Sequence, residues 1–457
     1  MQLNEDFIKQ MTEILPPNEA RTMVQSIEDQ EPVVAVRVND AKLQSIPDNF
    51  ERVPWCTHGV YLNERPAFTF DPQFHAGCYY VQDPSSMFIY HVIKSLVKQP
   101  VKYLDLCAAP GGKTTAALQA LPQGSIVVAN EIVPPRAQVL RENVIKWGYD
   151  NCMVTCDNPK AFNELTNEFD VVATDVPCSG EGMFRKDDEA VAQWSPQLVQ
   201  QCAQRQCSIL ADVWNALKPG GLLIYSTCTY NTHENEEIVD YIINTLGATA
   251  VDVQVKDSWL IHGAIGRNYP CYRFMPHMTR GEGLFMCVLR KNQNATALAK
   301  PAKKKSKSTS FSVLPVMRNW VSQNYTFSER NNIVVAVRKD IKEIVEGRFD
   351  KLHIIKEFGI QLGEIKGKKI IPSHQLAMSV NRMADAFPKC EVDYPTAIAY
   401  LRGEALTIDA PKGYVLITYH GATLGFANNL GNRANNLYPK SWRIMSTHAP
   451  QDAPTFL

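Results

Sequence analysis

The chain lacks long apolar segments. None of its 457 residues lies in a stretch that approaches the ~18 consecutive apolar residues of a membrane span. Its first residues include Asn4, Glu5, Asp6 and Lys9, which do not suit the apolar centre of a secretory signal peptide. These absences predict a cytosolic protein that has no membrane partner.

Cysteine pairs at metal-binding spacing are also missing. The twelve cysteines are scattered along the chain and none forms a CxxC pair. The closest two, Cys152 and Cys156, have no histidine nearby. A zinc site is therefore not expected, and in a cytosolic protein the thiols should be reduced.

The chain has no net charge, but its charges are unevenly distributed. Residues 300–457 hold 23 lysines and arginines against 13 acidic residues, or +10, which leaves 24 against 34, or −10, for residues 1–299. A basic C-terminal part on an acidic body favours a nucleic-acid partner, because phosphate contacts supply most sequence-independent affinity. A solvated basic surface without a partner is the alternative.

Between residues 99 and 292, apolar runs of strand length alternate with amphipathic helices. This alternation is typical of an α/β domain with a doubly wound, mostly parallel sheet. A helix is expected over residues 195–217, from a Ser-Pro cap to a Lys-Pro-Gly-Gly turn. The expected strands are 103–107, 125–130, 153–156, 169–174 and 221–226, with 271–274 and 284–289 as a closing antiparallel pair.

The length predicts several modules, because one hydrophobic core rarely serves more than about 250–300 residues. Residues 1–98 are expected to form an appended α+β module and 99–292 the central α/β domain. Residues 293–310 are charged and poor in apolar side chains, which predicts a basic linker. We expect a mixed α/β module at 311–395 and a small β-rich module at 396–457.

The first expected strand leads into a glycine turn and a helix at residues 105–115, DLCAAPGGKTT. Backbone N–H groups at such a turn can approach a ligand closely. As a Walker A loop the segment matches at Gly112, Lys113 and Thr114, but Cys107 stands where that loop requires its first glycine. Glu131, 20 residues past Gly111, suits the hydroxyl groups of a ribose.

Asp157, just after the third expected strand, could face an adenine ring. Glu131 and Asp157 could instead merely cap helices. The turn therefore predicts a nucleoside cofactor, and a nucleoside triphosphate is the competing ligand.

Two further strand ends carry cysteines: Cys178 in DVPCSG and Cys228 in STCTY. A thiolate that adds to carbon 6 of cytosine makes carbon 5 nucleophilic enough to accept a methyl group. This chemistry also needs an acid near ring N3, for which Asp175 is placed. Free cysteines are often simply buried, but the glycine, proline and hydroxyl neighbours of these two are poor core material. Position alone leaves open which cysteine is the nucleophile.

Four motifs carry a family resemblance: CAAPGGKTT, DVPCSGEGMFRKD, LKPGGLLIYSTCTYNTHENE and PHMTRGEGLF. Together they resemble the Sun-family RNA 5-methylcytosine methyltransferases, and within them the bacterial RsmF branch. The resemblance runs from about residue 77 to 290 and implies a Rossmann-like class I sheet that uses S-adenosylmethionine. The segments YLRGE and YPKSWR resemble the PUA-like RNA-binding module of that branch.

The resemblance also implies residue roles. Cys228 corresponds to the cysteine that attacks carbon 6, and Cys178 to the one that assists product release. Asn235 and Glu236 match positions that we interpret as organising the loop after the nucleophile. The implied cofactor contacts are Cys107, Ala108, Ala109, Pro110, Gly111, Gly112, Lys113, Glu131, Arg136, Asp157 and Asp175.

The implied substrate is a cytosine in the decoding region of 16S ribosomal RNA, with residues 1–98 helping to recognise RNA. A transfer RNA substrate stays open. Residues 425–436 are rich in asparagine where relatives commonly carry lysine, which puts RNA binding by that surface in doubt. Nothing in the sequence indicates a dimer.

Two readings from other classes remain. Gly112-Lys113-Thr114 and the strand at 171–175 could belong to a P-loop RNA-dependent NTPase. A catalytically silent rRNA-binding assembly factor is the second, and the intact Asp175, Cys178 and Cys228 argue against it.

Overall fold

The computed structural model describes residues 3–43, 45–293, 315–367, 369–446, 450 and 453–454. The expected linker at 293–310 lies, apart from residue 293, outside the described residues. Within the described part of the chain, no helix is both long and apolar enough to span a bilayer.

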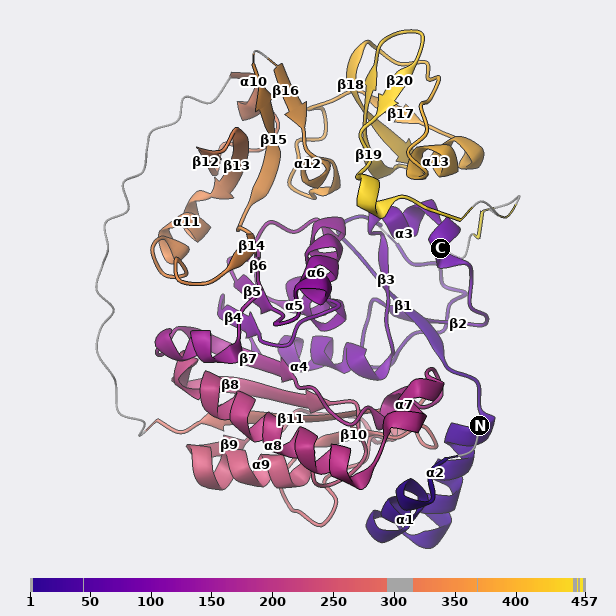
Figure 1. Cartoon of the computed structure of the whole chain (residues 1–457), viewed down its shortest axis with the longest axis vertical. Coiled ribbons are helices and arrows are strands. Elements are labelled where there is room, and N and C mark those ends of the chain that lie inside the picture. The colour runs from indigo at the N-terminus through magenta and orange to yellow at the C-terminus, as the bar shows by residue number, and fades with distance from the viewer. Residues whose placement is uncertain are drawn as a thin grey trace.

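A large mixed sheet forms the centre of the protein (Figure 1). Among the described residues it has nine strands, in the order β10-β11-β8-β7-β4-β5-β6-β14, with β9 paired to β11. The middle strands β4 to β8 run parallel, and β9, β10, β11 and β14 are antiparallel to their partners. The strands are β4 (Lys102–Asp105), β5 (Ile126–Asn130), β6 (Cys152–Thr155), β7 (Phe169–Asp175), β8 (Leu217–Thr227), β9 (Ala248–Ala250), β10 (Tyr272–Phe274), β11 (Leu284–Lys291) and β14 (Ile354–Lys356).

Both faces of this sheet are buried, which explains its near-continuous apolar strands. Alternate residues of β5 enter different cores: Val127 and Ala129 pack with one set of helices, and Ile126 and Val128 with another. The first set contains α4 (Phe88–Leu96), α5 (Gly112–Ala120) and α6 (Pro134–Trp147). The second contains α8 (Pro196–Val213) and α9 (Glu236–Tyr241). The predicted doubly wound fold is thereby confirmed.

The helix expected over 195–217 is shorter than predicted. It ends at Val213, and a 3₁₀ turn follows at Trp214–Ala216. Leu217 already belongs to β8, where it pairs with Phe169 of β7. Strand pairing therefore overrides the helical pattern at this end.

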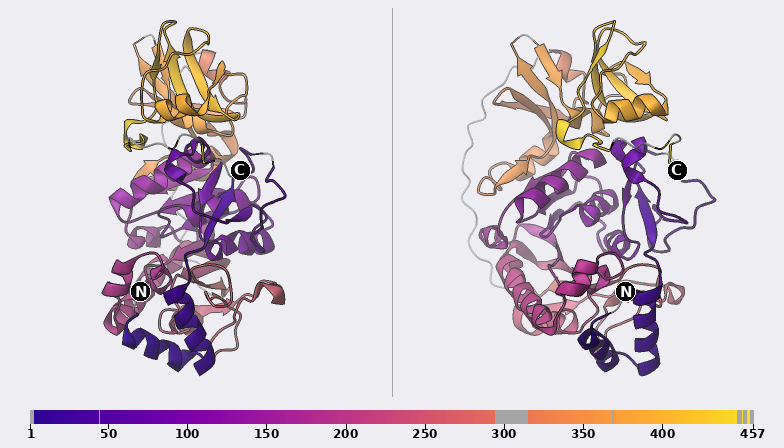
Figure 2. Two further views of the ribbon diagram at one scale, coloured as in Figure 1. Left: turned by 90° about the vertical axis from the view of Figure 1, so that its right-hand side faces the viewer. Right: turned by 45° about the vertical axis from the view of Figure 1, so that its right-hand side comes forward.

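The N-terminal part wraps around the central domain (Figure 2). Helices α1 (Glu5–Ile14) and α2 (Pro17–Asp29) precede a small sheet of β2 (Gly59–Leu62), β1 (Val34–Val38) and β3 (Tyr79–Val81), and α3 (Pro72–Ala76) lies before β3. Phe7 of α1 packs 5.1 Å from Phe184, between ring centroids. Arg37 of β1 is fully buried and donates to Gln119 and Thr115 of α5. These contacts fix the N-terminal part against the central domain.

The C-terminal part contains two further sheets. The first is β12 (Tyr325–Arg330), β13 (Ile333–Arg338), β15 (Ile360–Lys366) and β16 (Lys369–Pro372), with α10 (Pro315–Arg318), α11 (Lys339–Val345) and α12 (His374–Met378). The second is β17 (Lys389–Glu391), β18 (Gly413–Tyr419), β19 (Ala422–Asn429) and β20 (Ala434–Asn436), with α13 (Tyr394–Leu401). The expected boundary at 395/396 falls inside α13, because β17 already pairs with β18.

One strand of the C-terminal part leaves it to join the central sheet. In the chain β14 stands between β13 and β15, yet it pairs antiparallel with β6, with Ile354 opposite Thr155. The buried Lys356 side chain donates to the carbonyl of Cys152 at 2.8 Å. The central sheet is thus completed by a strand that the sequence pattern did not predict.

Candidate active site

The turn between β4 and α5 has a conformation that only glycine adopts readily. Gly111 has a φ of +113°, and a Cβ there would lie 3.2 Å from Leu140. α5 begins at Gly112, so the first N–H groups of the helix face the end of the sheet. Arg136 and Asn143 of α6 hold the turn by donating to the carbonyls of Ala109 and Pro110, at 3.1 and 2.8 Å.

Hydrogen bonds join the turn to the predicted cofactor carboxylates. Ala108 donates its N–H to the carbonyl of Asn130, and the Asn130 amide donates to the carbonyl of Asp157 at 3.0 Å. Glu131 is buried and lies 3.6 Å from the exposed guanidinium of Arg136. The predicted cofactor residues therefore lie along one edge of the sheet, at the carboxyl ends of β4, β5 and β6: Cys107, Ala108, Lys113, Glu131, Arg136 and Asp157.

Asp157 has a partner from far along the chain. Its Oδ2 accepts the backbone N–H of His353 at 2.8 Å, directly before β14. Burial raises the pKa of Asp157, and the hydrogen bond from His353 acts in the opposite direction. The C-terminal part thus contributes to the wall of the predicted cofactor site.

The two cysteines at the ends of β7 and β8 meet. The sulfur atoms of Cys178 and Cys228 lie 3.3 Å apart, and both side chains are partly buried. The hydrogen bond to Cys228 raises the pKa of the Cys178 thiol well above its usual range, and burial adds to this rise. Either thiol can be the donor in this contact between the two sulfurs.

Asp175 and Lys113 lie beside the cysteine pair. Lys113 donates to Asp175 Oδ2 at 2.8 Å, and Ser226 donates to Asp175 Oδ1 at 2.8 Å. Burial acts to lower the pKa of Lys113, but the negative charges of Asp175 and Cys228 raise it above its usual value. A cation is thus fixed within reach of both the carboxylate and the Cys228 sulfur.

Asn235 and Glu236, which we interpreted as loop organisers, both make contacts in the loop after the second cysteine. Thr227 donates to the side-chain oxygen of Asn235 at 2.6 Å, and the Asn235 amide donates to the carbonyl of Thr229. Glu236 forms a fully buried ion pair with Arg273 of β10, and Arg273 also donates to the carbonyl of Tyr230. These contacts fix the backbone on either side of Cys228.

Two buried carboxylates beneath the site, Glu234 and Glu181, were not predicted from the sequence. Glu234 accepts from the Ser179 N–H at 3.0 Å and from Gln206 at 2.8 Å, which ties the Cys178 loop to α8. Burial raises its pKa to about 7, although hydrogen bonds from Ser179 and Asn231 oppose the rise. Glu181 accepts the backbone N–H groups of Tyr230 and Asn231 at 2.6 and 3.1 Å. The three acids within the stretch after Cys228 were the available signal.

No group of three or more His, Cys, Asp or Glu side chains in the described ranges could hold a metal ion. All twelve cysteines are free thiols. At this edge of the sheet two thiols, a lysine and a carboxylate lie side by side.

Comparisons with known proteins cover most of the chain. A family model described as 16S rRNA methyltransferase RsmB/F matches residues 96–290. The model of the N-terminal domain of 16S rRNA methyltransferase RsmF matches residues 3–84, and that of the methyltransferase RsmF PUA domain matches residues 387–444. The chain belongs to the RsmB/F methyltransferase family. It is therefore an S-adenosylmethionine-dependent RNA methyltransferase that carries a PUA domain.

Full-length relatives agree with the domain matches. The chain is similar to ribosomal RNA small subunit methyltransferase F of Shewanella sp. (strain MR-7), with 29% identity over 96% of this chain and 97% of that protein. It is 28% identical to the protein of the same name from Serratia proteamaculans (strain 568), over 89% of each chain.

Solved structures support the fold alone. A methyltransferase homolog from Pyrococcus horikoshii has a TM-score of 0.53 and 24% identity, over 63% of this chain and 100% of the other. NSun6 from Pyrococcus horikoshii with SFG has a TM-score of 0.54 and 18% identity, over 63% and 98%.

Proposed function

We propose that the chain methylates carbon 5 of a cytosine in 16S ribosomal RNA through a covalent adduct between Cys228 and carbon 6 of the ring. The observation that carries this proposal is the contact of 3.3 Å between the sulfurs of Cys178 and Cys228 beside the Lys113–Asp175 pair. A buried structural cysteine needs neither a second thiol nor a charged lysine next to it. A thiol that must ionise, attack and later leave needs both.

S-adenosylmethionine would be held by the turn from Cys107 to Lys113, together with Glu131, Arg136, Asp157 and Asp175. The donor set supports this fit. Glu131 offers a carboxylate suited to ribose hydroxyls and Asp157 one suited to an adenine amino group, at the ends of neighbouring strands beside the glycine turn. When bound, the cofactor supplies an electrophilic methyl group at the thiol pair.

In the proposed reaction the Cys228 thiolate adds to carbon 6, and the electron density moves to carbon 5 and towards N3. Asp175, in its protonated form, gives a proton to N3 as charge develops there, and Lys113 and Ser226 stabilise the carboxylate that remains until N3 returns the proton. After carbon 5 has taken the methyl group, the deprotonated form of Cys178 removes the carbon-5 proton, and the raised pKa of Cys178 favours this uptake. The bond between carbon 6 and sulfur then breaks, and the Cys228 thiolate is regenerated. A target cytosine in an RNA helix must leave the helix to reach this site, at a cost of a few kcal/mol.

Lys113 also separates this proposal from the NTPase reading. In a P-loop the lysine reaches the phosphates, whereas here its ammonium group donates to Asp175. Calorimetry that compares ATP with S-adenosylhomocysteine should find binding of the second only. Tight binding of ATP would contradict the proposed function.

The substrate is tested by methyl transfer. Ribosomal RNA and transfer RNA from a strain that lacks the gene are incubated with the enzyme and the tritium-labelled cofactor, and then mapped by bisulfite sequencing. We expect newly protected cytosines in 16S RNA only. Label that appears only in transfer RNA would show that transfer RNA, and not 16S RNA, is the substrate. Label without any protected cytosine would exclude carbon 5 as the acceptor.

A further inference from the structure

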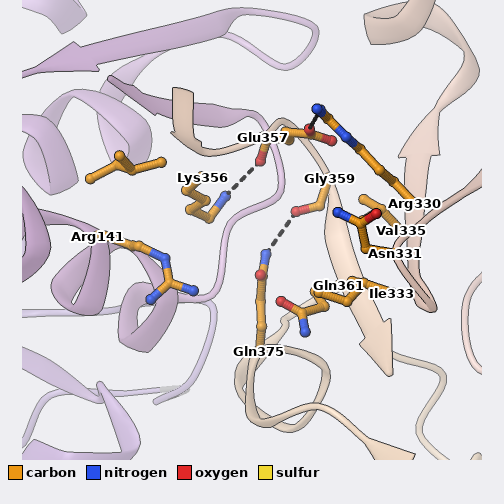
Figure 3. Close-up of a pocket in the computed structure, with 11 residues that line it drawn as sticks. Arg141, Arg330, Asn331, Ile333, Val335, Lys356, Glu357, Gly359, Gln361 and Gln375 are labelled. Atoms are coloured by element: carbon orange, nitrogen blue, oxygen red, sulfur yellow. Dashed lines mark hydrogen bonds and ion pairs between the residues drawn. The ribbon is translucent and has the colours of Figure 1, made fainter. Parts of the chain in front are cut away.

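A cavity of about 190 Å³ lies between the central domain and the first C-terminal sheet (Figure 3). Arg141 of α6 enters it from one side, and Asn331 and Gln361 enter it from the other. Lys356, at the end of β14, lies between them. Pockets for drug-sized ligands measure roughly 300–1,000 Å³, whereas one liquid water fills about 30 Å³. The cavity therefore suits a group such as a phosphate with a few waters.

The lining of this cavity offers many more donors than acceptors. Among the described residues, the side chains of Arg141, Asn331 and Gln361 make no hydrogen bond or ion pair. Lys356 donates to the carbonyls of Cys152 and Glu357, at 2.8 and 3.3 Å, which leaves its ammonium group a third hydrogen. These unused donors call for a ligand rich in acceptors.

The charges point the same way. Three cations, Arg141, Arg330 and Lys356, line the cavity. Its one carboxylate, Glu357, forms an ion pair with Arg330 at 3.8 Å. Burial lowers the pKa of both Arg141 and Lys356, whereas Glu142 acts to raise that of Arg141, and Cys152 and Asp150 act to raise that of Lys356, which the charge of Arg141 lowers further. Cations held close together and partly out of water are costly unless an anion offsets them.

We propose that this cavity binds a phosphate group of the RNA backbone, with Arg141 as its principal cationic contact and the amides of Asn331 and Gln361 as further donors. The inference rests on the proposed function in that it takes RNA as the substrate. A backbone phosphate is favoured over a free ion because the cavity opens beside the exposed Arg330, and residues 315–457 hold 18 lysines and arginines against 13 acidic residues, or +5. A strand of RNA bound here spans the central domain and the C-terminal sheet.

The test uses the full-length enzyme and its Arg141→Gln variant. Each phosphate contact contributes about −0.7 to the slope of log affinity against log salt for single-stranded nucleic acid. Arg141→Gln should therefore lower the magnitude of this slope for 16S RNA by roughly 0.7, and weaken binding about fivefold at 0.1 M salt. Arg141→Lys, which keeps the charge, should retain the slope. Inorganic phosphate should raise the melting temperature of the wild type more than that of Arg141→Gln.

The control is Arg205→Gln, because Arg205 is exposed on α8, on the other face of the central sheet. This variant should bind RNA as the wild type does, and all variants should bind S-adenosylhomocysteine equally. Equal salt slopes for Arg141→Gln and Arg205→Gln would overturn the inference. A phosphate response without a change in the RNA slope would also overturn it, since the cavity would then hold a free ion. Wild-type protein that does not bind RNA at all would instead contradict the proposed function.

Discussion

Replacing Cys178 should separate the formation of the covalent adduct from its release. In the folded protein the sulfurs of Cys178 and Cys228 lie 3.3 Å apart, so the Cys178 thiol can donate a hydrogen bond to a Cys228 thiolate. A hydrogen bond to a charged group is worth about 1.5–3 kcal/mol, so Cys178→Ala should slow the attack on RNA by roughly 10–100-fold. Release should slow much more, because the proposed reaction uses Cys178 to remove the proton from carbon 5 before the bond to Cys228 breaks. The adduct therefore accumulates.

The assay is a single-turnover reaction with labelled RNA and S-adenosylmethionine, quenched in detergent and resolved on a denaturing gel. Cys178→Ala should give a slowly rising band of protein linked to RNA. Cys178→Ser keeps a hydrogen-bond donor, so its band should rise at close to the wild-type rate of attack and then persist. Cys228→Ala should give no band and no methylation. A trapped band in Cys228→Ala, with none in Cys178→Ala, would reverse the roles of the two thiols.

Three further changes test the surroundings of the site. Gly77→Ala should lower the free energy of unfolding by about 1–3 kcal/mol in denaturant titrations, because Gly77 has a φ of +71° and a Cβ there would lie 2.1 Å from the carbonyl oxygen of Lys146. His353→Pro removes the N–H bound by Asp157, and calorimetry should show S-adenosylhomocysteine affinity reduced about 3–10-fold. Burial raises the pKa of Asp105 to about 7, so the folded protein keeps a proton that the unfolded chain releases above about pH 4. The free energy of unfolding of the wild type should therefore fall by up to roughly 1.4 kcal/mol per pH unit as the pH rises from about 4 to 7. In unfolding curves, Asp105→Asn should not show this fall, because its side chain has no proton to release.

Each of these changes has its own check. A Cβ on Gly263 would meet no atom within 4 Å, so Gly263→Ala should leave stability unchanged; an equal loss in both glycine variants would refute the role of the close contact. His353→Ala keeps the backbone donor and should bind the cofactor product normally. A parallel pH dependence in wild type and Asp105→Asn would show that this carboxyl ionises as freely in the folded protein as in the unfolded chain.

Local patterns in the sequence were sufficient for the parallel strands of the central sheet. The strands β4, β5, β6 and β7 are short apolar runs, and their carboxyl ends carry the polar residues that meet in the structure. Parallel strands bring their carboxyl ends to one edge, which is why Lys113, Asp175, Cys178 and Cys228 could be placed together before any distance was known. The family resemblance added the ranking of the two cysteines.

Contacts between distant segments could not be predicted in this way. Nothing in the apolar pattern of residues 354–356 distinguishes a strand that pairs with β6 from one that pairs within its own module. The partners of Glu181 and Glu234 come from several elements, so the acids resemble ordinary helix-start residues in the sequence. Burial and pKa shifts arise from the assembled fold and have no local signature.

The pairing of β14 with β6 has a consequence for how the enzyme is made. Thr155 leaves the ribosome about 200 residues before Ile354, its partner, so at 5–20 residues per second the edge of β6 waits roughly 10–40 s for its neighbour. During that time the nascent sheet presents unpaired backbone groups to which another chain could add. A shortened product that stops before residue 354 keeps this edge for good. Truncations after the central domain should therefore yield protein that aggregates, and a smaller working enzyme would need a new edge strand designed for β6.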